Sequence, residues 1–495
     1  MGREARFKKS FVLVDSMKYV LKYCMNWLFE SCPTGGQVPK KCDPKLKRLA
    51  HEFLTIGFEY QIFVLQYSLA YSGIRTLKTD GNDIIVDDST EIERRHNAYN
   101  NLILPTLLDK PDLIENEGMK DLIEIVGRTF RIKGDSFTYR LKPRDIIIGI
   151  EIIDVFHKYA YELPPDWNFS NYSLDEFRKT YSALSSIITY HNIAYVYSLR
   201  NKPPAGGFLG NIYTFKKHDL INRLIRYTGL SKDTVDSIFT DLTYGSHNFD
   251  NPDPALQPII PIAKEIFAIV PTLFISSSPE RNLVVLMNRI PKERQIYSKI
   301  KNKKESLMRD KIKDELKDYK FRYWSGKISR SSKLPDIDLV IIDDAQKILL
   351  LCELKWFIEP AEIQEVVQKS EEIKTGIEQV NKLKNEFDEV KKCLDKKLTL
   401  DSIYKYVFVV ISENFTGLSY VQDDNIAVIN SAHLVSKIKK NESLKDLDKW
   451  LKRKDYLPVE NIHYETHTNK YSLGKWSISH LGYESLIDSS LMNYT

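Results

Sequence analysis

Two carboxylates and a lysine are spaced to meet at one end of a β-hairpin in residues 334–357, LPDIDLVIIDDAQKILLLCELKWF. The apolar runs on both sides of DDAQK predict two strands joined by a tight turn centred on residues 345 and 346. In that register Asp338 faces Glu353, and Asp336 faces Lys355. Side chains alternate along a strand, so all four share one face, with facing Cβ atoms ~4.5–5.5 Å apart. The spacing therefore predicts a charged cluster on an otherwise apolar hairpin.

The predicted cluster of carboxyl groups needs a cation. Two carboxylates in contact repel each other and raise each other's pKa unless a positive charge lies between them. Mg²⁺ prefers oxygen ligands, typically one or two carboxylates together with water and substrate phosphate oxygens. Such an ion lowers the pKa of a bound water and neutralises charge that builds on a phosphate, and a nearby lysine can position either group. The residue types therefore point to metal-assisted hydrolysis of a phosphodiester.

The segments around the hairpin predict a sheet that is covered by helices on both faces. Apolar strands such as VFVVI are nearly continuous, which indicates burial on both sides. The expected order is helix, three strands, helix, two strands and helix. The predicted strands are 319–324, 337–343, 347–355, 404–412 and 426–430, and the helices after the hairpin are about 360–393 and 431–440. The expected fold class is α/β, with a mixed central sheet in an α/β/α core.

The motif resembles the PD-(D/E)xK nuclease superfamily, also called restriction-endonuclease-like. The resemblance rests on Pro335-Asp336-Ile337-Asp338 followed by Glu353-Leu354-Lys355, and it covers under a third of the chain. It implies that Asp338 and Glu353 bind Mg²⁺, with Mn²⁺ as a substitute, and that Lys355 assists the hydrolytic water. The alternative is a surface hairpin with charged ends and no catalytic role.

Several further residues are candidates for accessory roles. The literal PD of the motif is Pro335-Asp336, so Asp336 competes with the acidic residue two positions later, which the hairpin register favours. Many members of the superfamily add a Glu from the preceding helix. Glu305 is the best-placed match, with Glu315 behind it. Some members have a Gln in the following helix, which Gln379 or Gln364 matches.

Positive charge is concentrated in residues 292–333, immediately before the motif. This segment holds fifteen Lys or Arg against six Asp or Glu. Taken alone, such a run is typical of a solvated helix face. Beside a metal site it predicts contacts with backbone phosphates, which position a nucleic acid without reading its sequence. The residues predicted to bind nucleic acid are Lys299, Lys301, Lys303, Lys304, Arg322, Lys327, Arg330 and Lys333.

The remaining sequence predicts two regions that flank this core. Apolar residues at helical spacing in 43–74 and 174–200 indicate a mainly helical N-terminal region, with a short hairpin near Gly134. The C-terminal sequence THTNKYSLGKWSISHLGYE predicts a small hairpin that packs on the core. The expected organisation is a recognition or regulatory region at 1–290, a nuclease core at 291–440 and an extension at 441–495.

Composition and motif spacing exclude several other classes. The chain is 42% apolar and 28% charged, which is typical of a folded protein, and its net charge of +5 names no partner. No uncharged apolar run is long enough to span a bilayer, and no signal-peptide cleavage site follows the N-terminal apolar run. We therefore expect no membrane association and a cytoplasmic protein. The five cysteines form no C-x-x-C pair and the ten histidines no H-E-x-x-H motif.

One loop carries polar residues that invite a functional interpretation. His247, Asp250 and Asp253 lie in the Pro-rich stretch 244–258. Asn, Asp, Gly and Pro in such a stretch are typical of turns, so we expect these residues to shape the chain rather than to act on a substrate.

The expected activity is that of a Mg²⁺-dependent deoxyribonuclease, acting as an endonuclease. The resemblance implies restriction, anti-phage defence or DNA processing, and the sequence does not choose among them. Two alternatives stay open: RNA as the substrate, since the same site hydrolyses either backbone, and a non-catalytic nucleic-acid-binding or scaffold protein with an inert core. The expected macromolecular partner is DNA, and a homodimer or an accessory protein is left open.

Overall fold

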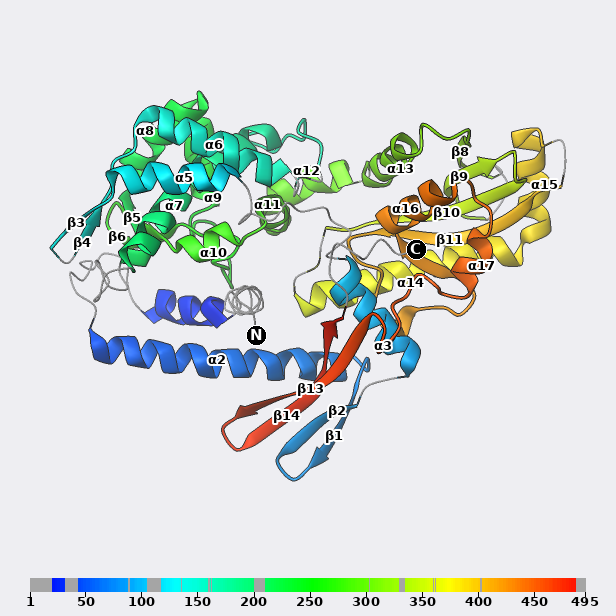
Figure 1. Ribbon diagram of the computed structural model, residues 1–495, viewed down its shortest axis with the longest axis horizontal. Helices are drawn as coiled ribbons and strands as arrows, with labels where there is room; N and C mark the ends of the chain where they lie inside the picture. The colour runs from blue at the N-terminus through cyan, green and yellow to red at the C-terminus, as the bar shows by residue number, and fades with distance from the viewer. Residues whose placement is uncertain are drawn as a thin grey trace. The chain divides into compact units, whose positions relative to one another are not determined.

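The chain forms two compact units, which are described separately. In the computed structural model, residues 1–62 and 110–300 make up the first unit, and residues 63–109 and 301–495 the second (Figure 1). The structure describes residues 20–31, 43–87, 90–104, 117–134, 136–158, 161, 163–199, 210–301, 303–328, 334–358, 360, 362–400 and 403–486. The change of unit at 300 lies close to the predicted border near 290, whereas residues 63–109 lie with the second unit.

The first unit is built around the long helix α7 (Leu174–Ser198), which is buried along most of its length. Ser173 begins this helix as its N-cap, forming a capping box with Glu176. A helix that is buried along most of its length needs neighbours on several sides. The helices in contact with it are α5 (Glu117–Thr129), α6 (Pro143–Lys158), α8 (Lys217–Thr228), α9 (Lys232–Asp241), α10 (Pro271–Ile275) and α11 (Pro279–Arg289), and α12 (Pro291–Lys301) follows them in the chain. Helix α2 (Pro44–Tyr71) contributes residues to both units.

Two small sheets accompany these helices. Strands β3 (Arg131–Lys133) and β4 (Ser136–Thr138) form the hairpin predicted near Gly134, which confirms that prediction. Gly134 has a φ of 60°, a conformation that favours glycine. A three-stranded sheet has the order β5-β7-β6 and is absent from the sequence prediction. Its strands are β5 (Tyr213–Lys216), β6 (Ile260–Ala263) and β7 (Ile266–Ile269).

A five-stranded mixed sheet forms the centre of the second unit, with the order β12-β11-β10-β9-β8. Strands β10, β11 and β12 run parallel, whereas β9 and β8 are antiparallel to their neighbours. The strands are β8 (Arg322–Gly326), β9 (Ile337–Asp343), β10 (Ile348–Trp356), β11 (Lys405–Glu413) and β12 (Ala427–Asn430). The predicted order of elements around the hairpin is therefore observed.

The pairing of β9 with β10 has the register predicted from the sequence. Leu349 pairs with Ile342, and Cys352 pairs with Leu339, where the recorded pairing ends. The helix that follows differs from the prediction, because it breaks into α14 (Ile363–Asn385) and α15 (Phe387–Leu398). Glu386 between them has a non-helical ψ of 36°. The break lets both Leu383 and Val390 reach the same apolar core.

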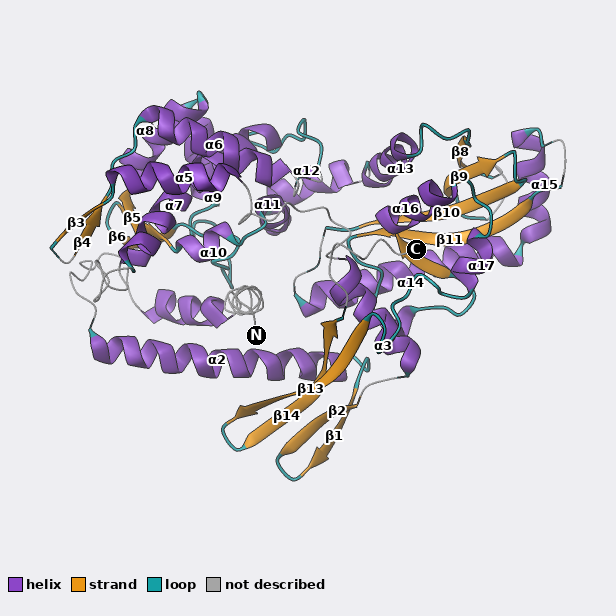
Figure 2. Ribbon diagram, viewed as in Figure 1, coloured by secondary structure: helices purple, strands orange, loops and turns teal. Residues whose placement is uncertain are grey.

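Helices cover both faces of this sheet (Figure 2). Helix α13 (Lys304–Glu315) and helix α16 (Ser431–Asn441) pack on one face, where Ile312 and Leu434 meet strand residues such as Leu350. Helices α14 and α15 pack on the other face, against strand residues such as Leu351 and Val410. The second unit therefore contains a three-layer α/β/α arrangement around a mixed sheet.

A second sheet of this unit joins segments that are far apart in the sequence. Its order is β1-β2-β14-β13, with β1 (Thr76–Asp80), β2 (Asp83–Asp87), β13 (Tyr464–Leu473) and β14 (Trp476–Ser485). The β13–β14 hairpin confirms the hairpin predicted near the C-terminus. Its strand β14 pairs in parallel with β2, so the predicted extension shares a sheet with residues near 80. Shorter elements complete the unit: α3 (Glu91–Ala98), η1 (Tyr99–Ile103), η3 (Ser419–Val421) and α17 (Leu447–Lys452).

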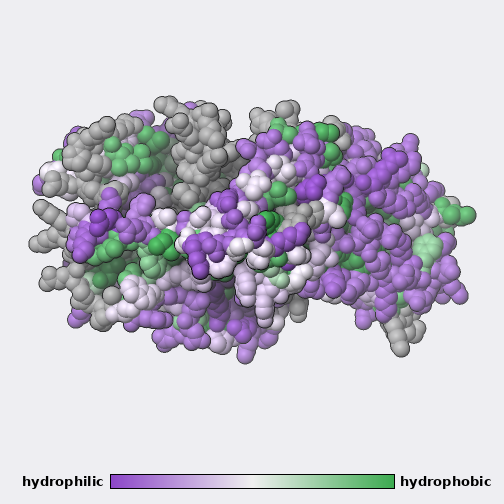
Figure 3. All heavy atoms as spheres, turned by 90° about the horizontal axis from the view of Figure 1, so that it is seen from below, coloured by the Kyte–Doolittle hydropathy of each residue, from purple (hydrophilic) through white to green (hydrophobic). Residues whose placement is uncertain are grey.

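The surface of the second unit is mainly polar in the view of Figure 3, where purple side chains dominate its right-hand part. Throughout the described ranges, no helix combines the length and the apolar character needed to cross a bilayer.

Candidate active site at the open end of the β9–β10 hairpin

Asp338 and Glu353 lie where the β9–β10 ladder ends. The recorded pairing stops at Cys352 and Leu339, and the same register continued by one residue sets Asp338 opposite Glu353. Beyond the ladder, Asp338 Oδ2 accepts a hydrogen bond of 2.9 Å from the backbone N–H of Leu354. The aspartate thus replaces a strand hydrogen bond with one from its side chain, which fixes its carboxyl group beside β10.

Glu353 and Lys355 share the face of β10 that is covered by α14, because they are two residues apart on one strand. Lys355 Nζ donates to Glu353 Oε1 at 2.7 Å and to Gln379 Oε1 of α14 at 3.2 Å. The side chain of Glu353 is 4% exposed and that of Lys355 is 15% exposed. The cluster is therefore largely shielded from water, and Lys355 bridges the sheet to the helix.

The two carboxyl groups of the cluster resist ionisation. The pKa of Glu353 is raised to about 7, mainly by burial and also by the nearby charges of Asp338 and Glu305, while Lys355 lowers it. Burial also raises the pKa of Asp338, against the lowering effects of the Leu354 N–H, Lys355 and Glu353. One lysine thus leaves both carboxyl pKa values above their ordinary range. A cation at this position would stabilise both ionised groups.

The donor set fits a hard divalent cation with few protein ligands. Within the described part of the chain, no three His, Cys, Asp or Glu residues are grouped so as to hold a metal ion. Two carboxylates are nevertheless the number that Mg²⁺ commonly takes from a protein when water and substrate phosphates complete its coordination. Asp338 and Glu353 would be those ligands.

Asp336 does not join this cluster. It is exposed and lies one residue before β9 begins at Ile337. Its predicted partner Lys355 instead donates to Glu353 and Gln379. Since the ladder has already ended at Leu339, no strand pairing holds Asp336 opposite β10.

Of the four accessory candidates on the flanking helices, two lie near the cluster and two do not. Gln379 contacts Lys355 directly, and the charge of Glu305 on α13 raises the pKa of Glu353, so both are near the cluster. Glu315 forms an ion pair with Lys439 instead. Gln364 is exposed in the first turn of α14.

The predicted nucleic-acid-binding residues have different surroundings. Lys304 is buried, with its Nζ 4.7 Å from the centre of the Trp356 ring. Arg322 forms a two-pronged pair with Asp344, at 2.6 and 2.7 Å. Both are therefore engaged inside the second unit, because burial or a fixed carboxylate partner withdraws their charge from a phosphate. Lys299, Lys303 and Lys327 are exposed, whereas Arg330, Lys333 and the side chain of Lys301 lie outside the described residues.

Two features near the cluster were missed by the sequence analysis. The charge of Arg309 on α13 lowers the pKa of Asp338. A pocket of about 260 Å³ borders Gln379 and is lined by Pro335, Thr375, Glu378, Gln379 and Lys382. The pocket residues that belong to α14 are three or four positions apart in the sequence. This spacing is the one sequence signal that could have shown that they share a helix face.

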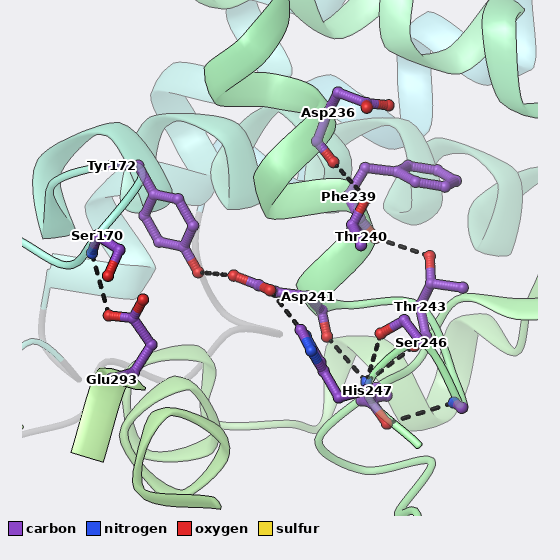
Figure 4. A network of polar contacts seen from close by, with 12 residues as sticks. Ser170, Tyr172, Asp236, Phe239, Thr240, Asp241, Thr243, Ser246, His247 and Glu293 are labelled. Carbon is purple, nitrogen blue, oxygen red and sulfur yellow. Dashed lines mark hydrogen bonds and ion pairs between the residues drawn. The ribbon is translucent and has the colours of Figure 1, made fainter. Parts of the chain in front are cut away.

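A polar network in the first unit explains the loop that contains His247 (Figure 4). Asp241 at the end of α9 accepts from the Tyr172 hydroxyl at 2.6 Å and contacts His247 Nε2 at 2.8 Å. Asp253 accepts from the backbone N–H of Ala255 at 2.8 Å, as expected of a turn residue. These contacts tie the loop to its neighbours, and among the described residues they form no group of three His, Cys, Asp or Glu that could hold a metal ion.

Comparisons of this chain with family models, with curated proteins and with solved structures each give no match.

Proposed function

We propose that the second unit is a metal-dependent nuclease that hydrolyses phosphodiester bonds of DNA. The observation that carries the proposal is the pair of carboxyl groups formed by half-buried Asp338 and buried Glu353, with Lys355 in contact with Glu353 at the end of a mixed sheet. A purely structural cluster of this kind is costly, because buried carboxylates need compensating charge. Perturbed carboxyl groups of this sort are typical of functional sites.

The same proposal extends to the fold of the second unit. A mixed sheet with helices on both faces supports a restriction-endonuclease-like core, in which the proposed metal ligands lie where the pairing of β9 with β10 ends. The first unit would then contribute recognition, regulation or assembly.

The residues of the chain divide the chemistry among them. Asp338 and Glu353 would hold Mg²⁺, or Mn²⁺ in its place, and the bound ion supplies a water of lowered pKa and neutralises phosphate charge. Lys355 donates its protons toward the attacking water or an oxygen of the scissile phosphate. Gln379 accepts from Lys355 and thereby orients the ammonium group. Burial of Glu353 keeps bulk water away from the group that carries the negative charge.

Cleavage of plasmid DNA by the full chain tests this proposal. We expect nicking in Mg²⁺ or Mn²⁺ that EDTA abolishes, and loss of nicking in the folded variants Lys355→Ala and Asp338→Ala. Lys384→Ala, which removes an exposed lysine of α14, serves as the matched control. Equal cleavage by wild type and the two site variants would contradict the assignment.

Two further outcomes separate the alternative functions. DNA binding that is indifferent to Mg²⁺ and to Lys355→Ala, without cleavage, would indicate an inert core. Metal-dependent cleavage of RNA but not DNA by the same protein would keep the site and change the substrate.

A further inference from the structure

Gly376 lies in the interior of α14, where that helix passes over the candidate site. Glycine weakens a helix interior because it loses the most backbone freedom on folding. The backbone gives no reason for glycine here, since Gly376 is helical and is not among the residues with positive φ. The reason must therefore be sought in what surrounds the residue.

A side chain at position 376 would collide with Lys355. A Cβ atom built on Gly376 would lie 2.9 Å from Lys355 Cε, 3.5 Å from Lys355 Cγ and 3.4 Å from Glu353 Cγ. Carbon atoms in contact normally sit ~3.5–4.0 Å apart. The lysine side chain thus occupies the space that any other residue would need.

The space beside Gly376 lies next to the contacts that hold Lys355. Gln379 follows Gly376 by three residues, so both lie on the same side of α14. Lys355 therefore passes the glycine, and its Nζ then reaches Glu353 Oε1 at 2.7 Å and Gln379 Oε1 at 3.2 Å. A larger residue at position 376 would push the Lys355 side chain away from its acceptors on Glu353 and Gln379.

We propose that Gly376 is a positioning residue of the candidate site, whose missing side chain lets Lys355 lie between α14 and Glu353. Its importance for catalysis rests on the proposed nuclease function, whereas its effect on the placement of Lys355 does not. Two helix glycines of the first unit, Gly127 and Gly149, differ from Gly376 in what they face. Gly149 would meet Ser186 and Tyr190, and Gly127 would meet Tyr197, all on the neighbouring helix α7.

The direct test is Gly376→Ala in the full chain, compared with Gln368→Ala as a matched control. Gln368 is an exposed, uncharged residue of the same helix. We expect Gly376→Ala to lower kcat for DNA cleavage at least tenfold, with KM within twofold of wild type and with Tm unchanged or higher. The control should keep the wild-type kcat. A wild-type kcat in Gly376→Ala would overturn the proposal.

A double-mutant cycle covers the case in which Gly376→Ala loses stability. If the collision is with the lysine stem, any loss of Tm should vanish when Gly376→Ala is made in the Lys355→Ala background. An equal loss of Tm in both backgrounds would show that the glycine serves packing elsewhere, and would overturn the proposal.

A spectroscopic readout separates this proposal from the nuclease proposal. In protein labelled with ¹⁵N-lysine, the Lys355 Nζ signal is assigned by its absence in Lys355→Ala. Its two acceptors should slow the exchange of its protons in wild type, and Gly376→Ala should remove that protection. If wild type cleaves no nucleic acid, the nuclease proposal fails while this comparison still decides the role of Gly376. A Lys355 signal equally protected in both proteins would overturn it.

Discussion

The two ends of the β9–β10 hairpin hold acidic residues in opposite electrostatic situations. At the turn, Asp344 accepts two hydrogen bonds from Arg322 and one of 2.6 Å from the Tyr404 hydroxyl. The Arg322 hydrogen bonds hold the pKa of Asp344 down to about 2. At the open end, burial raises the pKa of Glu353 to about 7 although Lys355 touches it.

Under the proposed function, this difference separates an ion pair that stabilises the fold from a site that would bind a cation. Asp344 accepts from both Arg322 and Tyr404 and is partly exposed, so its ionised form is already stabilised. Glu353 is buried and Asp338 half-buried, and the charges of Lys355 and Arg309 leave both carboxyl pKa values raised. A bound cation removes that cost, which is why the open end and not the turn is the candidate active site.

The largest expected effect concerns catalysis at the open end. Lys355→Ala should lower kcat by about 10²–10⁴-fold, the range typical of a positioned proton donor or electrostatic group. Arg322→Ala, which removes an equal charge at the turn, should leave kcat within about threefold of wild type, since it contacts no reacting group. Single-turnover cleavage of a labelled duplex measures both. Similar losses in the two variants would erase the proposed distinction between the ends.

The second prediction is that the two ends respond to pH with opposite sign in metal-free protein. The folded-state pKa of Glu353 is raised from 4.5 to about 7, so its folded form loses stability as pH rises through that window. Glu353→Gln should therefore gain stability relative to wild type between those pH values, by an amount on the order of 3 kcal/mol.

Asp344 gives the opposite response. Its pKa is lowered from 3.8 to about 2, so its stabilising effect is present above pH 3.8 and is lost as pH falls through 2. The advantage of wild type over Asp344→Asn should shrink over that acidic window. Urea unfolding in EDTA across both windows checks the two signs, and a parallel response at both ends would contradict the electrostatic account.

The third prediction concerns the contact that links the sheet to α14. Gln379→Ala should lower kcat about tenfold and leave Tm within a few degrees, because Lys355 keeps its bond to Glu353 and loses one of two acceptors. Gln364→Ala is the matched control, since Gln364 is exposed at the start of the same helix. Steady-state cleavage should place Gln379→Ala between the control and Lys355→Ala.

The smallest expected effect is on stability at the turn. Arg322→Ala should destabilise the protein by about 0.5–1 kcal/mol, because the pair with Asp344 is partly exposed and Tyr404 still donates to the aspartate. Lys317→Ala, which removes an exposed ion pair with Asp314, should cost less than that. Equilibrium denaturation compares them, and a loss of several kcal/mol in Arg322→Ala would mean that the turn is a larger determinant of the fold.

The hairpin could be predicted because its information is local. Two apolar runs and the tight turn between them set the register, and the register alone placed Asp338 opposite Glu353. The sheet formed by β2 and β14 could not be predicted in the same way. Its partners, such as Asp83 and Ser477, are nearly four hundred residues apart and pair in parallel, with no turn between them to signal the contact.

The partners of individual charges were equally hidden. Within the basic run, the sequence does not show that Arg322 pairs with Asp344 or that Lys304 is buried against the Trp356 ring. Both facts depend on tertiary contacts. Gly376 was overlooked for the same reason. An isolated glycine in a helical segment has meaning only once the strand beneath it is known.

Metal binding measured together with cleavage tests the central claim most directly. Mn²⁺ is titrated calorimetrically into wild type and Asp338→Asn, and DNA cleavage is measured on the same preparations. The account predicts that wild type binds the ion and cleaves DNA, and that Asp338→Asn loses both while remaining folded. Undiminished Mn²⁺ binding and cleavage in Asp338→Asn would contradict it, because the open end of the hairpin would then hold neither the metal nor the chemistry.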